Sequence, residues 1–172
     1  MSIEEHKKNY TKVNCMIVTI SDTRNHQTDK SGALMKELIE RAGHKIIEKE
    51  IVPDSRDAIR KQIEAGCENP MIDVIVTNGG TGIAYRDVTI ETVQPMLDKE
   101  LIGFGEIFRM LSYQEDIGSA AILSRAIAGV RQSTAIFCTP GSSGAVKLAM
   151  NKLILPEISH VVQEINKDIS HM

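Results

Sequence analysis

Aromatic residues are scarce in this sequence of 172 residues: they make up 3% of it, and tryptophan does not occur. A surface on which bases or sugars stack needs several aromatic side chains, so a stacking platform of that kind is not expected. An excess of positive charge is also missing, because 20 basic residues stand against 23 acidic ones and the net charge is −3. Nonspecific nucleic-acid binding depends on clustered positive charge and is not expected either.

Long apolar runs and paired cysteines are missing as well. No segment approaches the roughly 20 apolar residues of a membrane-spanning helix, and residues 1–12 are polar and lack the apolar core of a signal peptide. Cys15, Cys67 and Cys138 lie far apart without C-x-x-C spacing, and two of them lie inside apolar runs. We therefore expect a soluble cytoplasmic protein with buried free thiols and no membrane partner.

Apolar periodicity predicts strands that alternate with helices. Apolar runs indicate strands at residues 13–20, 45–52, 72–77 and 134–138. Helical spacing of apolar residues predicts helices at residues 34–42, 55–65, 90–97, 107–111, 146–153 and 158–169. Gly66 is expected to end the second helix, residues 120–127 fit a short helix or an edge strand, and residues 129–133 are expected to form a hairpin turn.

This alternation predicts a mostly parallel sheet between helical layers, with an antiparallel hairpin at one edge. No repeat or linker interrupts the pattern, so we expect a polar tail at residues 1–12 and a single domain at residues 13–172. In such sheets ligands bind beyond the carboxyl ends of the strands. The polar or glycine-rich segments that follow strands are residues 21–23, 53–54, 78–82 and 140–144.

The most informative of these segments is the glycine loop, residues 78–82, which reads N-G-G-T-G and follows a buried strand. Three glycines in four positions allow backbone N–H groups to approach an anion closely, although such glycines also serve simple tight turns. The loop matches neither the P-loop spacing nor the dinucleotide fingerprint, and no histidine pair suggests a metal site. Asp54 and Asp87 follow strand ends and could hold Mg²⁺ against a polyphosphate, or could cap the helices that follow them.

Six sequence fragments, in order along the chain, resemble the MoaB/MogA family of molybdenum cofactor biosynthesis proteins. Residues 77–89 (TNGGTGIAYRDVT) are similar to its T-G-G-T-G…R-D-V-T signature. The other fragments are residues 18–24 (VTISDTR), 52–54 (VPD), 103–106 (GFGE), 121–126 (AILSRA) and 140–142 (PGS). The segment PGSSGAVKLA looks more like the MoaB branch than the MogA branch.

The resemblance implies a three-layer α/β/α domain, related to the G domain of gephyrin, that binds molybdopterin. In active branches of the family the domain transfers AMP from Mg-ATP to the terminal phosphate of molybdopterin. It also implies a homo-trimer or homo-hexamer, and other enzymes of molybdenum cofactor biosynthesis as possible partners. Because MoaB-branch proteins are not uniformly active, a catalytically inactive molybdopterin-binding or scaffold protein is the alternative.

The resemblance also implies roles for residues at the predicted rim. The glycine loop would donate N–H groups to nucleotide phosphates, and Asp54 and Asp87 would act through Mg²⁺ or position substrate. Arg86 and Arg125 are candidate phosphate partners, or else solvated or ion-paired surface residues. Asn78 stands where the family signature has threonine, and it tolerates the same loop shape. The candidate nucleotide- or molybdopterin-binding residues are Ser21, Asp22, Asn78, Gly79, Gly80, Thr81, Gly82, Arg86, Glu106, Ser124, Arg125, Pro140, Gly141 and Ser142.

Overall fold

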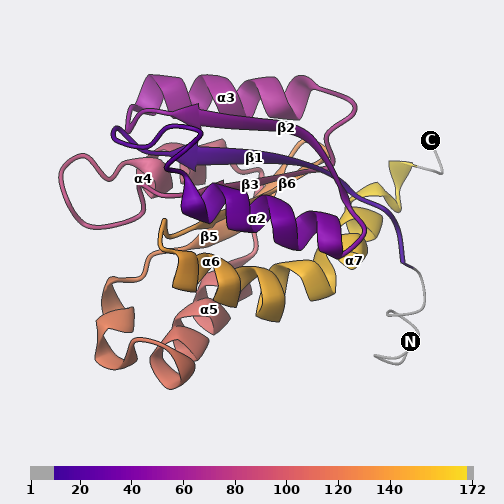
Figure 1. Ribbon diagram of the computed structural model, residues 1–172. Coiled ribbons are helices and arrows are strands. Elements are labelled where there is room, and N and C mark those ends of the chain that lie inside the picture. Colours follow the sequence, from indigo (N-terminus) through magenta and orange to yellow (C-terminus); the bar gives the residue numbers. More distant parts are fainter. Residues whose placement is uncertain (1–9, 170–172) are drawn as a thin grey trace.

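A six-stranded sheet forms the centre of the computed structural model, which describes residues 10–169 (Figure 1). Its strands are β1 (Asn14–Ile20), β2 (Lys45–Val52), β3 (Val74–Asn78), β4 (Lys99–Glu100), β5 (Ile127–Arg131) and β6 (Thr134–Thr139). The strand order is β2-β1-β3-β6-β5-β4. The first four strands in this order run parallel, and β5 and β4 add to the edge in antiparallel pairing. The predicted mixed sheet is therefore confirmed.

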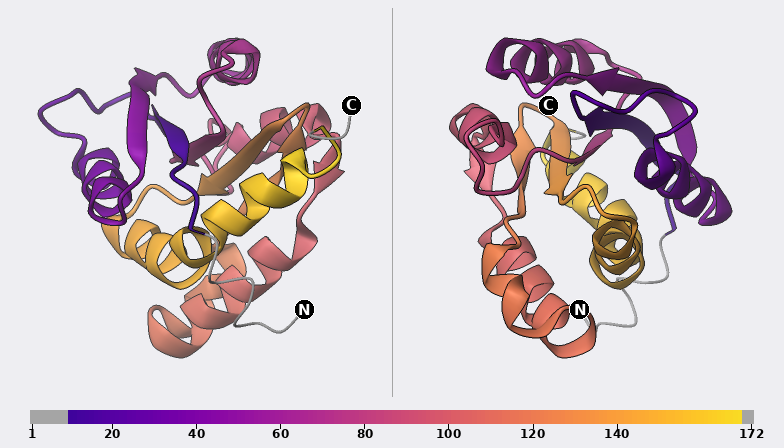
Figure 2. Two further views of the ribbon diagram at one scale, coloured as in Figure 1. Left: turned by 90° about the vertical axis from the view of Figure 1, so that its right-hand side faces the viewer. Right: turned by 60° about the vertical axis from the view of Figure 1, so that its left-hand side comes forward.

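Helices cover both faces of the sheet (Figure 2). They are α2 (Lys30–Arg41), α3 (Arg56–Glu68), α4 (Thr89–Val93), α5 (Ile102–Glu115), α6 (Ser143–Ala149) and α7 (Leu155–Asn166), with 3-10 segments η1 (Gln94–Met96) and η2 (Gly118–Leu123) and a π segment η3 (Met150–Ile154). Side chains of α3 and α4 pack on one face, and those of α2, α5, α6 and α7 pack on the other. This arrangement confirms the three-layer α/β/α fold. Among residues 10–169, no helix is both long and apolar enough to span a membrane.

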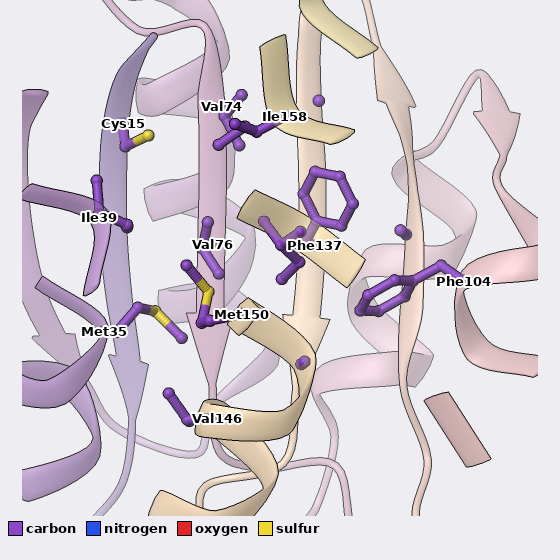
Figure 3. Packing of buried hydrophobic residues seen from close by; sticks show 14 of the residues in the cluster. Cys15, Met35, Ile39, Val74, Val76, Phe104, Phe137, Val146, Met150 and Ile158 are labelled. Atoms are coloured by element: carbon purple, nitrogen blue, oxygen red, sulfur yellow. The ribbon is translucent and has the colours of Figure 1, made fainter. Parts of the chain in front are cut away.

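The apolar core lies in two layers because the central strands are buried on both faces. Along β1, Cys15 and Ile17 pack with Met35 of α2, whereas Met16 and Val18 belong to the cluster under α3. Figure 3 shows the first layer, in which side chains from α2, α6 and α7 meet those of the central strands. The continuous apolar runs of the sequence thus reflect strands without a solvent face.

Two local predictions were wrong. Gly66 lies inside α3, which continues to Glu68, and a Cβ at Gly66 would lie 2.6 Å from Ile75 Cδ1. The glycine therefore serves close packing of the helix on the sheet instead of ending it. The hairpin turn is formed by Gln132 and Ser133, because residues 127–131 already pair with β6. The ambiguous residues 120–127 divide between η2 and the start of β5.

The last two predicted helices are parts of one continuous helical run, because α6, η3 and α7 follow each other without a break. The π segment η3 makes a wider turn than an α-helix, because the Leu155 N–H donates to the Met150 carbonyl five residues before it. Pro156 follows directly, and proline has no N–H to donate and crowds the carbonyl four residues before it. A π turn ahead of a proline accommodates both effects.

Candidate functional site

The sheet topology brings the polar segments together at one edge. Residues 21, 53, 79 and 140 follow the carboxyl ends of the neighbouring parallel strands β1, β2, β3 and β6. Because β5 runs antiparallel to β6, the segment that precedes β5, with Ser124 and Arg125, reaches the same rim. β1 connects outward to β2, and the chain then crosses to β3 on the other side of β1, so the strand order reverses between β1 and β3. Such a switch point is where open α/β sheets bind ligands.

A pocket of about 550 Å³ opens at this rim. The loops after β1, β2, β3 and β6 form its polar side, and η2 contributes an apolar wall. Its lining residues are Ile20, Ser21, Thr23, Arg24, Asp54, Gly79, Gly80, Thr81, Gly82, Arg86, Asp87, Ile117, Ala120, Leu123, Ser124, Pro140 and Gly141.

Glycine is required at two positions of the glycine loop. Gly79 and Gly80 have φ angles of 102° and 66°, a region that side chains strongly disfavour. A Cβ at Gly79 would overlap the backbone carbonyl of Ile20, and a Cβ at Gly80 would overlap the Thr89 hydroxyl. The loop therefore needs its glycines for backbone shape and for close packing on β1 and α4.

Four consecutive carbonyls of the glycine loop accept hydrogen bonds from residues that do not line the pocket. The Gly79 carbonyl accepts a hydrogen bond from Thr89 Oγ1 (3.0 Å), and the Gly80 carbonyl accepts one from the Thr89 N–H (3.0 Å). The carbonyls of Thr81 and Gly82 accept bonds from Arg125 Nε (2.9 Å) and Nη2 (2.7 Å). Thr89 and Arg125 do not line the pocket, whereas the loop does.

The N–H groups of the same four peptide units are left available. In a trans peptide the C=O and N–H point in opposite directions, so the N–H groups of residues 80–83 point away from Thr89 and Arg125. Within residues 10–169, none of the four donates to a protein acceptor. Successive N–H groups of this kind form an anion-binding concavity. Anion binding by these N–H groups, which the glycine pattern indicated, stays a prediction.

Asp87 closes the outer part of the loop. Its Oδ2 accepts a hydrogen bond from the Ala84 N–H at 3.0 Å, and a Cβ at Gly82 would lie 2.6 Å from the same oxygen. Helix α4 begins with Val88 at its N-cap and has no side-chain cap, so the capping alternative for Asp87 is wrong. Both Asp87 and the exposed Arg86 line the pocket.

Asp54 lies against Asp22 and next to the glycine loop, since a Cβ at Gly80 would lie 3.0 Å from Asp54 Oδ1. The Asp22 N–H donates to Asp54 Oδ2 (3.1 Å), and the Asp54 N–H donates to Asp22 Oδ1 (2.9 Å). Burial raises the pKa of Asp54, and the negative charges of Asp22 and Asp87 raise it further. Ser55 is the N-cap of α3, so the capping alternative for Asp54 is also wrong. The pocket thus holds carboxylates whose repulsion a bound cation would relieve.

Asn78 is the last residue of β3, and its buried side chain takes part in a polar network beneath the loop. Its Oδ1 accepts a hydrogen bond from Ser31 Oγ (2.7 Å), and its Nδ2 donates to Thr19 Oγ1 (3.0 Å). Arg24 donates to Ser31 Oγ and to the Gly141 carbonyl (2.9 Å). The network therefore links the strand under the glycine loop to the second glycine-rich turn.

The pocket contains most of the predicted site residues but not all of them. Five predicted residues are not among its lining residues: Asp22, Asn78, Glu106, Arg125 and Ser142. Glu106 is exposed on α5, and Ser142 is the N-cap of α6, where its Oγ accepts the Ala145 N–H. Arg24 was missed, although it ends the VTISDTR fragment and follows a strand end, which is the signal that could have identified it.

Among residues 10–169, no group of three His, Cys, Asp or Glu side chains is arranged to bind a metal. Asp54 and Asp87 fit a weaker mode, in which Mg²⁺ keeps waters and is bound by one or two carboxylates together with substrate phosphates.

The chain is similar in sequence to a family of known proteins over most of its length. The family described as a probable molybdopterin binding domain matches residues 16–160. The chain belongs to this family. Molybdenum cofactor biosynthesis protein B of Bacillus subtilis (strain 168) is 62% identical to it over 169 residues, 98% of this chain and 99% of that protein.

Solved structures agree with this assignment. A crystal structure of molybdenum cofactor biosynthesis protein B has a TM-score of 0.90 at 57% identity, and the alignment covers 91% of this chain and 98% of that one. The tungsten cofactor synthesizing protein MoaB from Pyrococcus furiosus has a TM-score of 0.77 at 35% identity, with coverage of 91% and 99%. The MoaB/MogA resemblance of the sequence fragments is therefore confirmed across nearly the whole chain.

Proposed function

We propose that this protein acts in molybdenum cofactor biosynthesis, where it binds molybdopterin and transfers AMP from Mg-ATP to the terminal phosphate of molybdopterin. Family membership and relatives named molybdenum cofactor biosynthesis protein B support the pathway. The observation that carries the proposed chemistry is the row of four available N–H groups at residues 80–83, which lies beside the carboxylates of Asp54 and Asp87 in one pocket.

The reaction needs little from protein side chains. The second pKa of a phosphate monoester is about 6, so the terminal phosphate of molybdopterin is largely a dianion at neutral pH and is already nucleophilic. Its oxygen bonds to the α-phosphorus of ATP, the bond from that phosphorus to the bridging oxygen breaks, and pyrophosphate leaves with the electron pair. Positioning and charge neutralisation are then the main tasks of the protein.

The pocket residues suit these two tasks. The N–H groups of residues 80–83 would bind the nucleotide phosphates, and Arg86 lies beside them at the pocket edge. Asp54 and Asp87 would contact the magnesium that arrives with ATP, and this contact would offset the burial and the repulsion from Asp22 and Asp87 that raise the pKa of Asp54. The apolar wall, which includes Ile117 and Leu123, offers a surface for a flat ring system.

The experiment that tests this proposal replaces each carboxylate. Asp54→Asn and Asp87→Asn proteins would be titrated calorimetrically with Mg-ATP and with molybdopterin, and turnover would be followed by pyrophosphate release. We expect each substitution to slow turnover by about a hundredfold, because each weakens the contact with the magnesium that neutralises the reacting phosphates. Asp57→Asn, at an exposed aspartate in the first turn of α3, is the matched control. Wild-type turnover in both pocket variants would refute the roles of Asp54 and Asp87.

Binding without turnover is the alternative that the sequence left open, and Asn78 is the residue that departs from the family signature in the glycine loop. The Asn78 side chain lies beneath the loop and outside the pocket lining, so its replacement of threonine does not remove a group from the pocket surface. We therefore favour the enzyme. A protein that binds molybdopterin and Mg-ATP but releases no pyrophosphate would support the alternative.

We also propose that the protein assembles as a homo-trimer or homo-hexamer. Helix α5 carries four large apolar side chains with exposed fractions of 44–62%, namely Ile102, Ile107, Met110 and Tyr113. Exposed apolar groups gathered on one element are typical of protein interfaces. Light scattering on the wild type and on Met110→Glu tests this proposal. A monomeric wild type would contradict it, and a smaller assembly for the variant would support it.

A further inference from the structure

The guanidinium of Arg125 makes four hydrogen bonds behind the glycine loop. Its Nε and Nη2 donate to the Thr81 and Gly82 carbonyls, and Nη1 and Nη2 also form a two-point contact with the carboxylate of Glu91, at 3.2 Å for Nη2 to Oε2. Glu91 lies on α4, and no motif or comparison assigns it a role. Neither Arg125 nor Glu91 lines the pocket.

Only a guanidinium can make this set of contacts. Arginine presents five N–H donors in a rigid planar fork, so two neighbouring carbonyls and one carboxylate can be held at once. The ammonium group of lysine is a single point charge on a flexible stem and would not hold Thr81 and Gly82 in fixed orientations. Three segments meet at Arg125: the glycine loop, α4, and the connection from η2 to β5.

The ion pair fixes the direction of the anion-binding donors. With the Thr81 and Gly82 carbonyls held by Arg125, the N–H groups of Gly82 and Ile83 must point the opposite way. Glu91 neutralises the guanidinium and holds its fork in place. The hydrogen bonds from Arg125, followed by its charge, lower the pKa of Glu91, so the carboxylate stays ionised at neutral pH.

We propose that Glu91 and Arg125 form a positioning pair that orients the outer half of the glycine loop toward nucleotide phosphates without contacting the phosphates. This inference deepens the proposed function and rests on it for the identity of the anion. It also chooses between the roles that the sequence left open for Arg125, which were a direct phosphate partner or a solvated or ion-paired surface residue. The two roles predict opposite results when the charge of Glu91 is removed.

The probe is inorganic pyrophosphate with Mg²⁺, titrated calorimetrically into the wild type, Glu91→Gln and Arg125→Lys. Turnover with Mg-ATP and molybdopterin is measured in parallel. The matched control is the exposed pair Glu37 and Arg41 on α2, at 3.3 Å, replaced as Glu37→Gln and Arg41→Lys. We expect Glu91→Gln and Arg125→Lys each to bind pyrophosphate about tenfold more weakly, because the N–H groups of the glycine loop are misaligned. Each control variant should bind as the wild type does.

A double variant separates positioning from direct contact. If Glu91 acts through Arg125, Glu91→Gln adds no further loss to Arg125→Lys. If Arg125 instead contacts the anion directly, Glu91→Gln frees its charge and leaves affinity unchanged or stronger, which would overturn the proposal. Urea unfolding of all variants shows whether any loss of affinity comes from a loss of global stability.

Failure of the proposed function gives a different pattern. A wild type that binds pyrophosphate but transfers no AMP contradicts the enzyme, while the affinity comparison still tests the pair. If the wild type binds neither pyrophosphate nor Mg-ATP, the pair is tested by NMR, through the backbone amide resonances of residues 80–83. Displaced resonances in Glu91→Gln and unchanged ones in Glu37→Gln would then support the pair, and unchanged resonances in both would overturn it.

Discussion

Replacing Gly80 with alanine tests how the glycine loop is built. Gly80 has a φ of 66°, and an added Cβ would overlap Thr89 Oγ1 and lie 3.0 Å from Asp54 Oδ1 and 3.1 Å from Ile20 Cγ2. Thr89 would have to move, and its hydroxyl would lose the hydrogen bond to the Gly79 carbonyl. The substitution therefore combines backbone strain, a steric clash and a lost hydrogen bond.

The expected cost follows from these three effects. An L-residue in the left-handed region costs about 1 kcal/mol. A buried hydrogen bond contributes about 1 kcal/mol, and displaced packing adds a similar amount. We therefore expect Gly80→Ala to lower the free energy of unfolding by about 2–3 kcal/mol. Because the clash lies behind the N–H groups, we also expect weaker binding of Mg-ATP.

Gly118→Ala is the matched control, because Gly118 has a similar φ of 59° but no atom within 4 Å of the added Cβ. It isolates the backbone strain, so its expected cost is about 1 kcal/mol. Urea unfolding of both variants and the wild type measures the difference. Equal stabilities for Gly80→Ala and Gly118→Ala, within about 0.5 kcal/mol, would refute the view that the loop packs tightly against Thr89.

Three further predictions concern buried polar groups and thiols. Asn78→Ala should lower the free energy of unfolding by about 2 kcal/mol in urea titrations, because it removes two buried hydrogen bonds, one from Ser31 Oγ and one to Thr19 Oγ1; an unchanged stability would contradict this. Burial, followed by repulsion from Asp22, raises the pKa of Asp54 from its usual 3.8, so the contribution of Asp54 to stability falls as pH rises above about 3.8; without Mg²⁺, the unfolding midpoint of Asp54→Asn should therefore rise relative to that of the wild type across this range, and a difference that does not change with pH would contradict it. Burial raises the pKa of Cys15 and Cys138 to about 12, so a disulfide reagent at pH 8 should label them only when the protein unfolds; rapid labelling of the folded protein would show that they are accessible.

Much of the site could be predicted because it depends on local patterns and on topology. Glycines after a buried strand indicate a loop free of side chains, and the alternation of strands and helices places such loops at one rim. Asp54, Asp87 and Arg86 follow from the same reasoning, because each lies just beyond a strand end or in the loop after it. All of these residues line the pocket.

Other features could not be predicted, because they depend on the exact residue at which a strand ends or on contacts between residues far apart in the sequence. Side chains alternate along a strand, and β3 extends one residue further than its apolar run suggests, so Asn78 belongs to the sheet and not to the loop. Arg125 lies 34 residues from Glu91 and 44 from Thr81, and no local spacing indicates that they meet. Gly66 carries the same local signal whether it ends a helix or packs against a sheet.

Pyrophosphate release from purified protein supplied with molybdopterin, ATP and Mg²⁺ distinguishes AMP transfer from binding alone. We expect one pyrophosphate released for each adenylylated molybdopterin formed, with release about a hundredfold slower in Asp54→Asn and in Asp87→Asn. Tight binding of both ligands without any release of pyrophosphate would contradict this expectation.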